Sequence, residues 1–269
     1  MSLTYSYFQD QDPGYFGEPL ASIAKEALTI RYYLLPFLYL LFYRHSVAGD
    51  TVARPLWHEF PTDLTTWDIH DQFLWGEALL ISPVVQEGER SRRVYLPPSS
   101  RWFSVGRLFT GGNWSEAAAG DQEVEAPLDL IPLHLRGGHI LPLQRPAVNT
   151  KLSRTNPLEL LAGLDDDISA RGSIFLDDGE TVDTVANGQY FLGDLQIRDN
   201  TLTMTVVHND DVAVAGLHFE RIVVLGFREP IRSIIVNGDD YTDWTFSDGA
   251  LSINNLSLQV NDNFEILFL

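Results

Sequence analysis

The chain has 269 residues, of which 37 are Asp or Glu and 18 are Lys or Arg, so its formal net charge is −19. Sequence-independent nucleic-acid binding needs clustered Lys and Arg, which argues against it here, and a hydrophobic content of 45% argues against wholesale disorder. The chain contains no cysteine, which excludes disulfides, thiolate nucleophiles and cysteine-ligated metal sites.

One long helix is predicted over residues 18–48. Pro19 suits the first turn of a helix, and the dense apolar run that follows stops near Gly49. A membrane span would need about 20 consecutive apolar residues. Arg31 interrupts this run and Pro36 would kink it. The pattern therefore favours a buried helix and no membrane span.

From residue 51 onward the chain changes character. Short β-branched and aromatic runs are separated by clusters of Gly, Pro, Asn and Asp, and turn pairs such as Asn237-Gly238 are typical of antiparallel strands. Many short strands at this spacing predict β-sandwiches rather than a parallel sheet. The polar stretch at residues 147–156 is the best domain boundary, and we expect a mainly β protein with a helical leader.

The residues that could carry chemistry are sparse. The seven histidines are scattered and could form a metal site only by long-range convergence. No Gly-x-Ser-x-Gly segment is present, and no glycine pair has a phosphate-binding spacing. The sequence therefore predicts no metal and no cofactor.

Acidic residues cluster in three places. The segments 67–71 and 176–180 set acids beside large apolar groups, where a raised pKa could arise. For the second segment we favour a strand-connecting turn that binds no metal, with Gly179 at positive φ, because Asp bonds its own backbone in such turns. The acids of this turn are Asp177, Asp178 and Glu180. The third cluster, at 164–167, is more typical of a solvated loop.

Five segments, taken together and in order, point to one family. They cover residues 31–43, 49–63, 66–85, 126–150 and 172–181. They resemble the C-terminal portion of family 31 glycoside hydrolases, the family of the animal lysosomal and intestinal α-glucosidases. Weaker similarity runs on to the end of the chain.

The resemblance implies an architecture. Residues 1–79 would be the terminal helix and strand of an incomplete (β/α)8 barrel, residues 80–148 a proximal β-sandwich and residues 149–269 a distal β-sandwich. A whole barrel needs about 250 residues, so most of it would lie outside this chain.

The resemblance also implies a mechanism, namely retaining hydrolysis of terminal α-linked glucose by two carboxylates about 5–5.5 Å apart. In the family the nucleophile lies in a Trp-x-Asp-Met-Asn-Glu segment and the acid/base in a Gly-Asp-Asn segment, and neither occurs here. Trp67 and the Gly193-Asp194 pair only superficially resemble them. No catalytic, cofactor-binding or metal-binding residue is therefore carried over, and we expect the chain to be inactive without the missing barrel.

Some residues are expected to play supporting roles. Arg54 would need a buried acceptor, for which Glu59 and Asp71 are candidates. Asn113 and Asn255 begin N-glycosylation sequons that would be used only on the secretory route. The resemblance suggests a lysosomal or extracellular location for a full-length parent.

Two alternatives remain open from the sequence. One is a free-standing β-sandwich carbohydrate-binding module, with Trp102, Trp114 and Trp244 as sugar platforms, although core or turn positions are favoured for these aromatics. The other is an accessory domain that only packs against a catalytic partner.

The helix itself carries a further prediction. It is apolar nearly all round, so part of residues 20–46 should lack a partner and support self-association. The side chains that cannot all face one sandwich are Leu34, Leu35, Phe37, Leu38, Leu40, Leu41 and Phe42.

Overall fold

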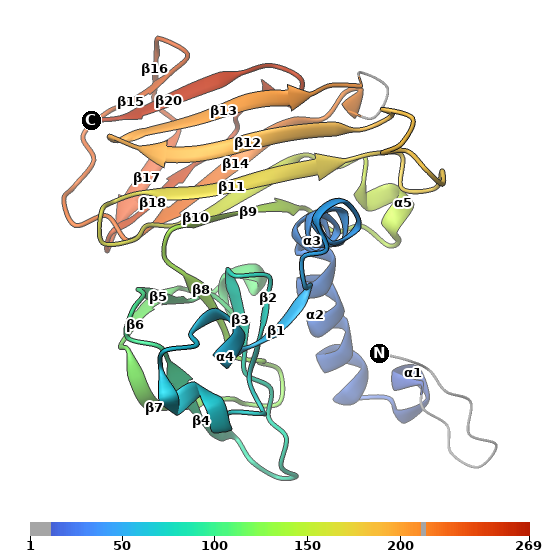
Figure 1. Ribbon diagram of the computed structural model, residues 1–269, viewed down its shortest axis with the longest axis vertical. Coiled ribbons are helices and arrows are strands. Elements are labelled where there is room, and N and C mark those ends of the chain that lie inside the picture. Colours follow the sequence, from blue (N-terminus) through green and yellow to red (C-terminus); the bar gives the residue numbers. More distant parts are fainter. Residues whose placement is uncertain (1–11, 211–213) are drawn as a thin grey trace.

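The computed structural model describes residues 12–210 and 214–269 of a mainly β protein. A small sheet and a large sheet lie one above the other in Figure 1, with two helices beside and between them. The mainly β class predicted from the sequence is confirmed.

The predicted long helix is present but is divided in two. The helices of this region are α1 (Pro13–Phe16), α2 (Leu20–Tyr33) and α3 (Leu35–Ala48). Leu34 ends α2 and begins α3, because Pro36 has no N–H to give to the preceding turn. Gly49 then ends α3 at φ 77°, a backbone conformation that glycine adopts without strain. No helix in the described part of the chain is long and apolar enough to cross a membrane.

The small sheet lies next to α2 and α3. Its strands are, in sheet order, β1 (Ala53–Pro55), β2 (Phe73–Trp75), β3 (Leu79–Ile81), β8 (Leu133–Arg136), β5 (Trp102–Ser104) and β6 (Ser115–Ala117). Against it pack a two-stranded ribbon and short helices, namely β4 (Ser91–Leu96), β7 (Gly120–Glu125), α4 (Leu56–Glu59), η1 (Leu64–Asp68) and η2 (Leu108–Thr110). A core cluster that includes Leu56, Leu80 and Trp102 joins the ribbon and α4 to this sheet.

The large sheet has 12 strands and wraps around a core of its own. Its path begins with β16 (Asp239–Tyr241), β15 (Ile234–Val236), β20 (Phe264–Phe268), β13 (Thr201–His208), β12 (Phe191–Arg198) and β11 (Ala170–Leu176). It continues with β9 (His139–Gln144), β10 (Leu158–Gly163), β14 (His218–Leu225), β18 (Ala250–Ile253) and β17 (Trp244–Ser247), and β19 (Leu258–Gln259) pairs with β14. The helix α5 (Thr150–Ser153) connects β9 to β10.

Strand β12 illustrates why this sequence forms a sheet with one buried face. Phe191, Gly193, Leu195 and Ile197 are buried and the residues that alternate with them are more exposed, which is the period of two that a half-buried strand requires. Most neighbouring strands are antiparallel, as predicted. However, β10 runs parallel to β14 and β11 parallel to β9, so the sheet is mixed.

The boundaries expected between the three parts of the chain, at 79/80 and 148/149, fall inside the two hydrogen-bonded sheets. Strand β3 begins at Leu79, and β9, before residue 148, pairs along its length with β10. The chain passes from the small to the large sheet at Gly137 and Gly138, between β8 and β9. The division at 79/80 and 148/149 thus does not coincide with hydrogen-bonded sheets, and it stays a proposal.

A shared core joins the helices to both sheets. It combines helix residues such as Phe37 and Leu41 with Phe103 of the small sheet and Leu141 and Leu161 of the large sheet. Of the seven apolar helix residues named above, four are buried, namely Leu34, Phe37, Leu40 and Leu41. Each such burial stabilises the fold by roughly 1.5–3 kcal/mol. Phe42 remains 52% exposed, so the helix is only partly covered.

Candidate functional site

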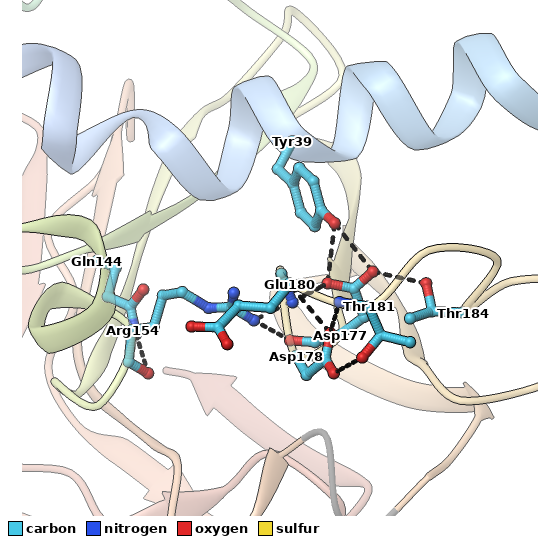
Figure 2. Close-up of polar contacts among 9 residues, drawn as sticks. Tyr39, Gln144, Arg154, Asp177, Asp178, Glu180, Thr181 and Thr184 are labelled. Carbon is cyan, nitrogen blue, oxygen red and sulfur yellow. Dashed lines mark hydrogen bonds and ion pairs between the residues drawn. The ribbon is translucent and has the colours of Figure 1, made fainter.

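A dense set of polar contacts surrounds Asp177, directly after β11 (Figure 2). Its side chain is 4% exposed. Its carboxylate accepts hydrogen bonds from the Tyr39 hydroxyl at 2.8 and 2.9 Å and from Thr184 Oγ1 at 2.8 Å. It also accepts one from the Gly179 backbone N–H at 2.8 Å. Helix α3 and the connection between β11 and β12 therefore converge on one buried acid.

The charge of Asp177 is balanced by Arg154. Arg154 Nη2 lies 3.8 Å from Asp177 Oδ1 and also donates to the Asp177 carbonyl oxygen. Gln144 in turn donates to the Arg154 carbonyl at 3.1 Å and so fixes the backbone that carries the guanidinium (Figure 2). A buried carboxylate with a cation and several donors is satisfied in the way that burial of a charge requires.

The turn predicted for residues 176–180 is confirmed. Gly179 has φ 63°, and a Cβ built there would lie 1.4 Å from Arg154 Nη1. Asp178 accepts from the N–H groups of Glu180 at 3.0 Å and Thr181 at 2.8 Å, and from the Thr181 hydroxyl. These bonds, led by that from the Thr181 hydroxyl, lower the Asp178 pKa to about 2.

Each of the three acids of the turn is engaged by neighbouring groups. Asp177 is fully occupied by its partners, and Asp178 is used by the turn itself. Glu180 is exposed, with Lys151 Nζ at 3.8 Å. Among residues 12–210 and 214–269, no group of three or more His, Asp or Glu is arranged to hold a metal ion.

What the Asp177 arrangement can do is fasten α3 to the large sheet. Tyr43, one turn after Tyr39, stacks on Phe175 with a centroid distance of 4.1 Å and an interplanar angle of 10°. Tyr39 also contacts Phe175, at 5.5 Å. Burial, followed by the hydrogen bond to Asp177, raises the Tyr39 pKa to about 12, so the hydroxyl stays a donor. The helix is thus held by two tyrosines on one face.

A second, half-buried ion-pair cluster lies at the small sheet. Arg54 Nη1 is 2.5 Å from Glu59 Oε1, which confirms one of its two candidate partners. The other, Asp71, pairs with Arg92 instead, at 3.1 Å. Arg136, which the sequence did not single out, contacts Glu59 Oε2 at 3.4 Å from 77 residues away. Only the fold of β8 brings Arg136 to this carboxylate.

The remaining acidic candidates lie in a loop and within a strand. The cluster at 164–167 is a loop in which Asp165 Oδ1 accepts from the Ser169 N–H at 2.8 Å, while Asp166 pairs with Arg228 on the surface at 2.6 Å. The Gly193-Asp194 pair lies within β12, opposite β11.

The tryptophans considered as sugar platforms are not on open surfaces. Trp102 is fully buried and its indole N–H donates to the Pro97 carbonyl at 2.9 Å, as the favoured core interpretation predicts. Trp114 packs on Phe103 at 5.9 Å, and Trp244 packs against the core of the large sheet.

The two sequon asparagines differ in their surroundings. Asn113 is exposed. Asn255 is also exposed, but it has φ 52° and its side-chain amide donates to Asp243 at 2.6 Å. Attachment of a sugar at Asn255 would replace one hydrogen of an amide that is already bonded.

Comparison with known proteins gives a consistent set of matches. Residues 49–141 match the family model described as the glycosyl hydrolase family 31 C-terminal domain. Intestinal sucrase-isomaltase of Oryctolagus cuniculus is 40% identical over 96% of this chain, which spans 14% of that protein. Lysosomal alpha-glucosidase of Rattus norvegicus is 36% identical over 95% of this chain, which spans 28% of that protein.

Solved structures show the same fold. The glucosidase II alpha subunit superposes with a TM-score of 0.85 at 24% identity, over 97% of this chain and 30% of that one. A Flavobacterium johnsoniae GH31 dextranase superposes with a TM-score of 0.79 at 19% identity. The chain thus spans between 14% and 34% of the length of these relatives and structures.

Proposed function

Because the chain is related, over nearly its whole length, to the C-terminal portion of family 31 glycoside hydrolases, we propose that it is the C-terminal part of an α-glucosidase. The complete enzyme would hydrolyse terminal α-linked glucose from oligosaccharides with retention of configuration. The relatives that support this substrate class are intestinal sucrase-isomaltase and lysosomal alpha-glucosidase.

In this proposal the chain alone has no glycosidase activity. The family's two carboxylate-bearing segments do not occur in the sequence, and the relatives extend far beyond the region matched here. The attacking carboxylate and the acid/base of the retaining mechanism would both lie in the missing barrel.

The role of this part is to support the barrel. In the proposed division, residues 1–79 end the barrel, residues 80–148 form the proximal sandwich and residues 149–269 the distal one. The observation that carries the role is the fastening of α3 by Asp177, which would hold the last barrel helix against the large sheet. A barrel helix fixed at this face would keep the neighbouring strands in register.

A complementation experiment tests the proposal. The chain is assayed alone with p-nitrophenyl α-glucoside, and then after co-expression with the preceding part of its parent coding sequence. We expect no release of p-nitrophenol from the chain alone and activity from the co-expressed pair. If the chain alone released p-nitrophenol in proportion to its concentration, with host enzyme excluded, the proposal that it is inactive alone would be contradicted. An inactive but folded pair would contradict the α-glucosidase assignment.

A further inference from the structure

A polar groove runs along α3 where this helix crosses the large sheet. It encloses about 310 Å³ between α3 and strands β9, β11 and β12. This volume falls in the range of about 300–1,000 Å³ that is typical of small-molecule sites. Its lining combines the apolar helix residues Phe37, Leu40 and Leu41 with polar and charged side chains.

A second hollow continues the groove. It encloses about 810 Å³ beside the loop of residues 164–167. His139, Arg171 and Gln196 line both hollows. The two are therefore neighbours at these three side chains, and together they offer an elongated site rather than a single pocket.

Donors and acceptors alternate on the walls of the first hollow. Arg44 Nη2 donates to Ser173 Oγ at 3.3 Å, and Ser173 Oγ donates to Asp194 Oδ1 at 3.1 Å. Arg44 Nη1 lies 3.9 Å from Glu77. These bonds leave further lone pairs on both carboxylates and further N–H groups on the guanidinium, because each group can make more bonds than it makes here.

The residues at the junction have the most unused capacity. In the described part of the chain, the side chains of His139, Arg171 and Gln196 make no hydrogen bond or ion pair. Burial, and then the nearby arginines, lower the His139 pKa to about 3, so its ring is neutral. A neutral imidazole presents one donor and one acceptor, and the guanidinium and the amide add a planar fork of donors and a donor–acceptor pair.

We propose that this groove binds a neutral oligosaccharide. Planar side chains that donate and accept match vicinal hydroxyl groups, and apolar side chains in the lining match the C–H face of a pyranose ring. The presence of a sugar site is inferred from the groove alone, whereas its identity as an α-glucan rests on the function proposed above. A neutral ligand is favoured because two cations, Arg44 and Arg171, and two acids, Glu77 and Asp194, line the same hollow.

The experiment measures binding of maltotriose to the 269-residue chain by calorimetry. We expect saturable binding that is weakened about tenfold or more in Arg171→Ala and Asp194→Ala, since each removes a charged hydrogen-bonding group. Ser173→Phe, which fills the groove without removing a charge, should also abolish binding. The control is Arg93→Ala, an exposed arginine of the two-stranded ribbon paired with Asp121, which should bind like the wild type.

Several results would overturn the proposal. They are no binding by the folded chain, unchanged binding in both Arg171→Ala and Asp194→Ala, or tighter binding of inorganic phosphate than of maltotriose. Far-UV circular dichroism and melting temperature establish that each variant is folded. Because this chain lacks the proposed catalytic carboxylates, binding here is read independently of the glucosidase assay, and either proposal can fail without the other.

Discussion

Tyr39 on α3 donates its hydroxyl hydrogen to the carboxylate of Asp177, at 2.8 and 2.9 Å from the two oxygens, across 138 residues of the chain. The acceptor is buried and negatively charged, and the donor is attached to the only long helical region of the described chain. Loss of a partner from a buried charge is more costly than loss of a surface bond. This hydroxyl should therefore contribute measurably to the attachment of the helix to the sheet, beside the Tyr43 stacking and the shared core.

Tyr39→Phe is expected to lower the free energy of unfolding by about 1–3 kcal/mol, the desolvation cost of a buried acceptor that loses its donor. Urea unfolding followed by fluorescence measures the change. The matched control is Tyr32→Phe on the neighbouring helix, because no hydrogen bond of that hydroxyl is found in the described structure. An equal effect of the two substitutions would contradict the role of the bond.

The same hydroxyl predicts a pH dependence at the alkaline end. The Tyr39 pKa is about 12 in the folded chain against a usual value of 10.0, so the folded state holds this proton longer than the unfolded state. The stabilisation is present below pH 10 and is lost as the pH rises from about 10 to about 12. Tyr39→Phe should flatten the fall in stability over this interval. A variant with the wild-type slope would show that other groups cause the fall.

Gly179→Ala should cost more than backbone strain alone. A left-handed conformation costs an L-residue about 1–2 kcal/mol, and the new methyl group would also displace Arg154 from Asp177. The control is Gly188→Ala, because Gly188 has φ 70° and a Cβ there would come no closer than 3.8 Å to another residue. Thermal unfolding of the two variants separates the cost of the backbone conformation from the cost of displacing Arg154. In an Arg154→Ala background the cost at Gly179 should fall to that at Gly188.

The same region allows a test of the turn against a metal site. Added Ca²⁺ should leave the melting temperature unchanged, because the Asp178 carboxylate already accepts bonds from Glu180 and Thr181. A rise in melting temperature that disappears in Asp178→Asn would contradict the turn interpretation.

Local chemistry explains which parts of the structure the sequence could predict. The break at Pro36, the end of the helix at Gly49 and the turn at Gly179 all follow from the conformations open to single residues and their neighbours. Each was predictable because no distant contact decides it.

The contacts that define the sites could not be predicted from the sequence, because they join residues that lie far apart in the chain. Arg136 meets Glu59, and Tyr39 meets Asp177, only after strands far apart in the chain have paired. The limits of the sheets could not be predicted for the same reason, since β9 joins β10 through long-range pairing. Similarity to a family indicated the order of the parts but not which side chains touch.

His134 should make the chain sensitive to acid. It is 1% exposed on β8, its Nδ1 has no hydrogen-bond partner within the described chain, and burial lowers its pKa to about 4 from 6.5. The unfolded state binds the proton first as the pH falls, so stability is full above pH 6.5 and is lost towards pH 4. His139 acts in the same direction.

Unfolding free energies of the wild type and His134→Gln, measured between pH 4 and 7, test this expectation. The difference between the two chains should shrink as the pH falls, because only the wild type must keep a neutral imidazole at this position. A difference that does not vary with pH would contradict it. Because the carboxylates titrate in both chains, their contribution to the pH dependence of stability cancels in the difference.

The partly covered helix predicts self-association of this chain. Leu28 and Phe42 are 45% and 52% exposed, whereas Phe37 fills the core shared with both sheets. Deletion of residues 1–48 would uncover that core and confuse loss of fold with loss of contact. Leu28→Glu and Phe42→Glu avoid this, since they charge only the outer face and should cost less than about 0.5 kcal/mol of stability. Light scattering should then give a dimer or larger species for the wild type and a monomer for the double variant, with similar melting temperatures. A wild type that is a clean monomer and binds no hydrophobic dye would show that the helix is already sufficiently covered within the chain.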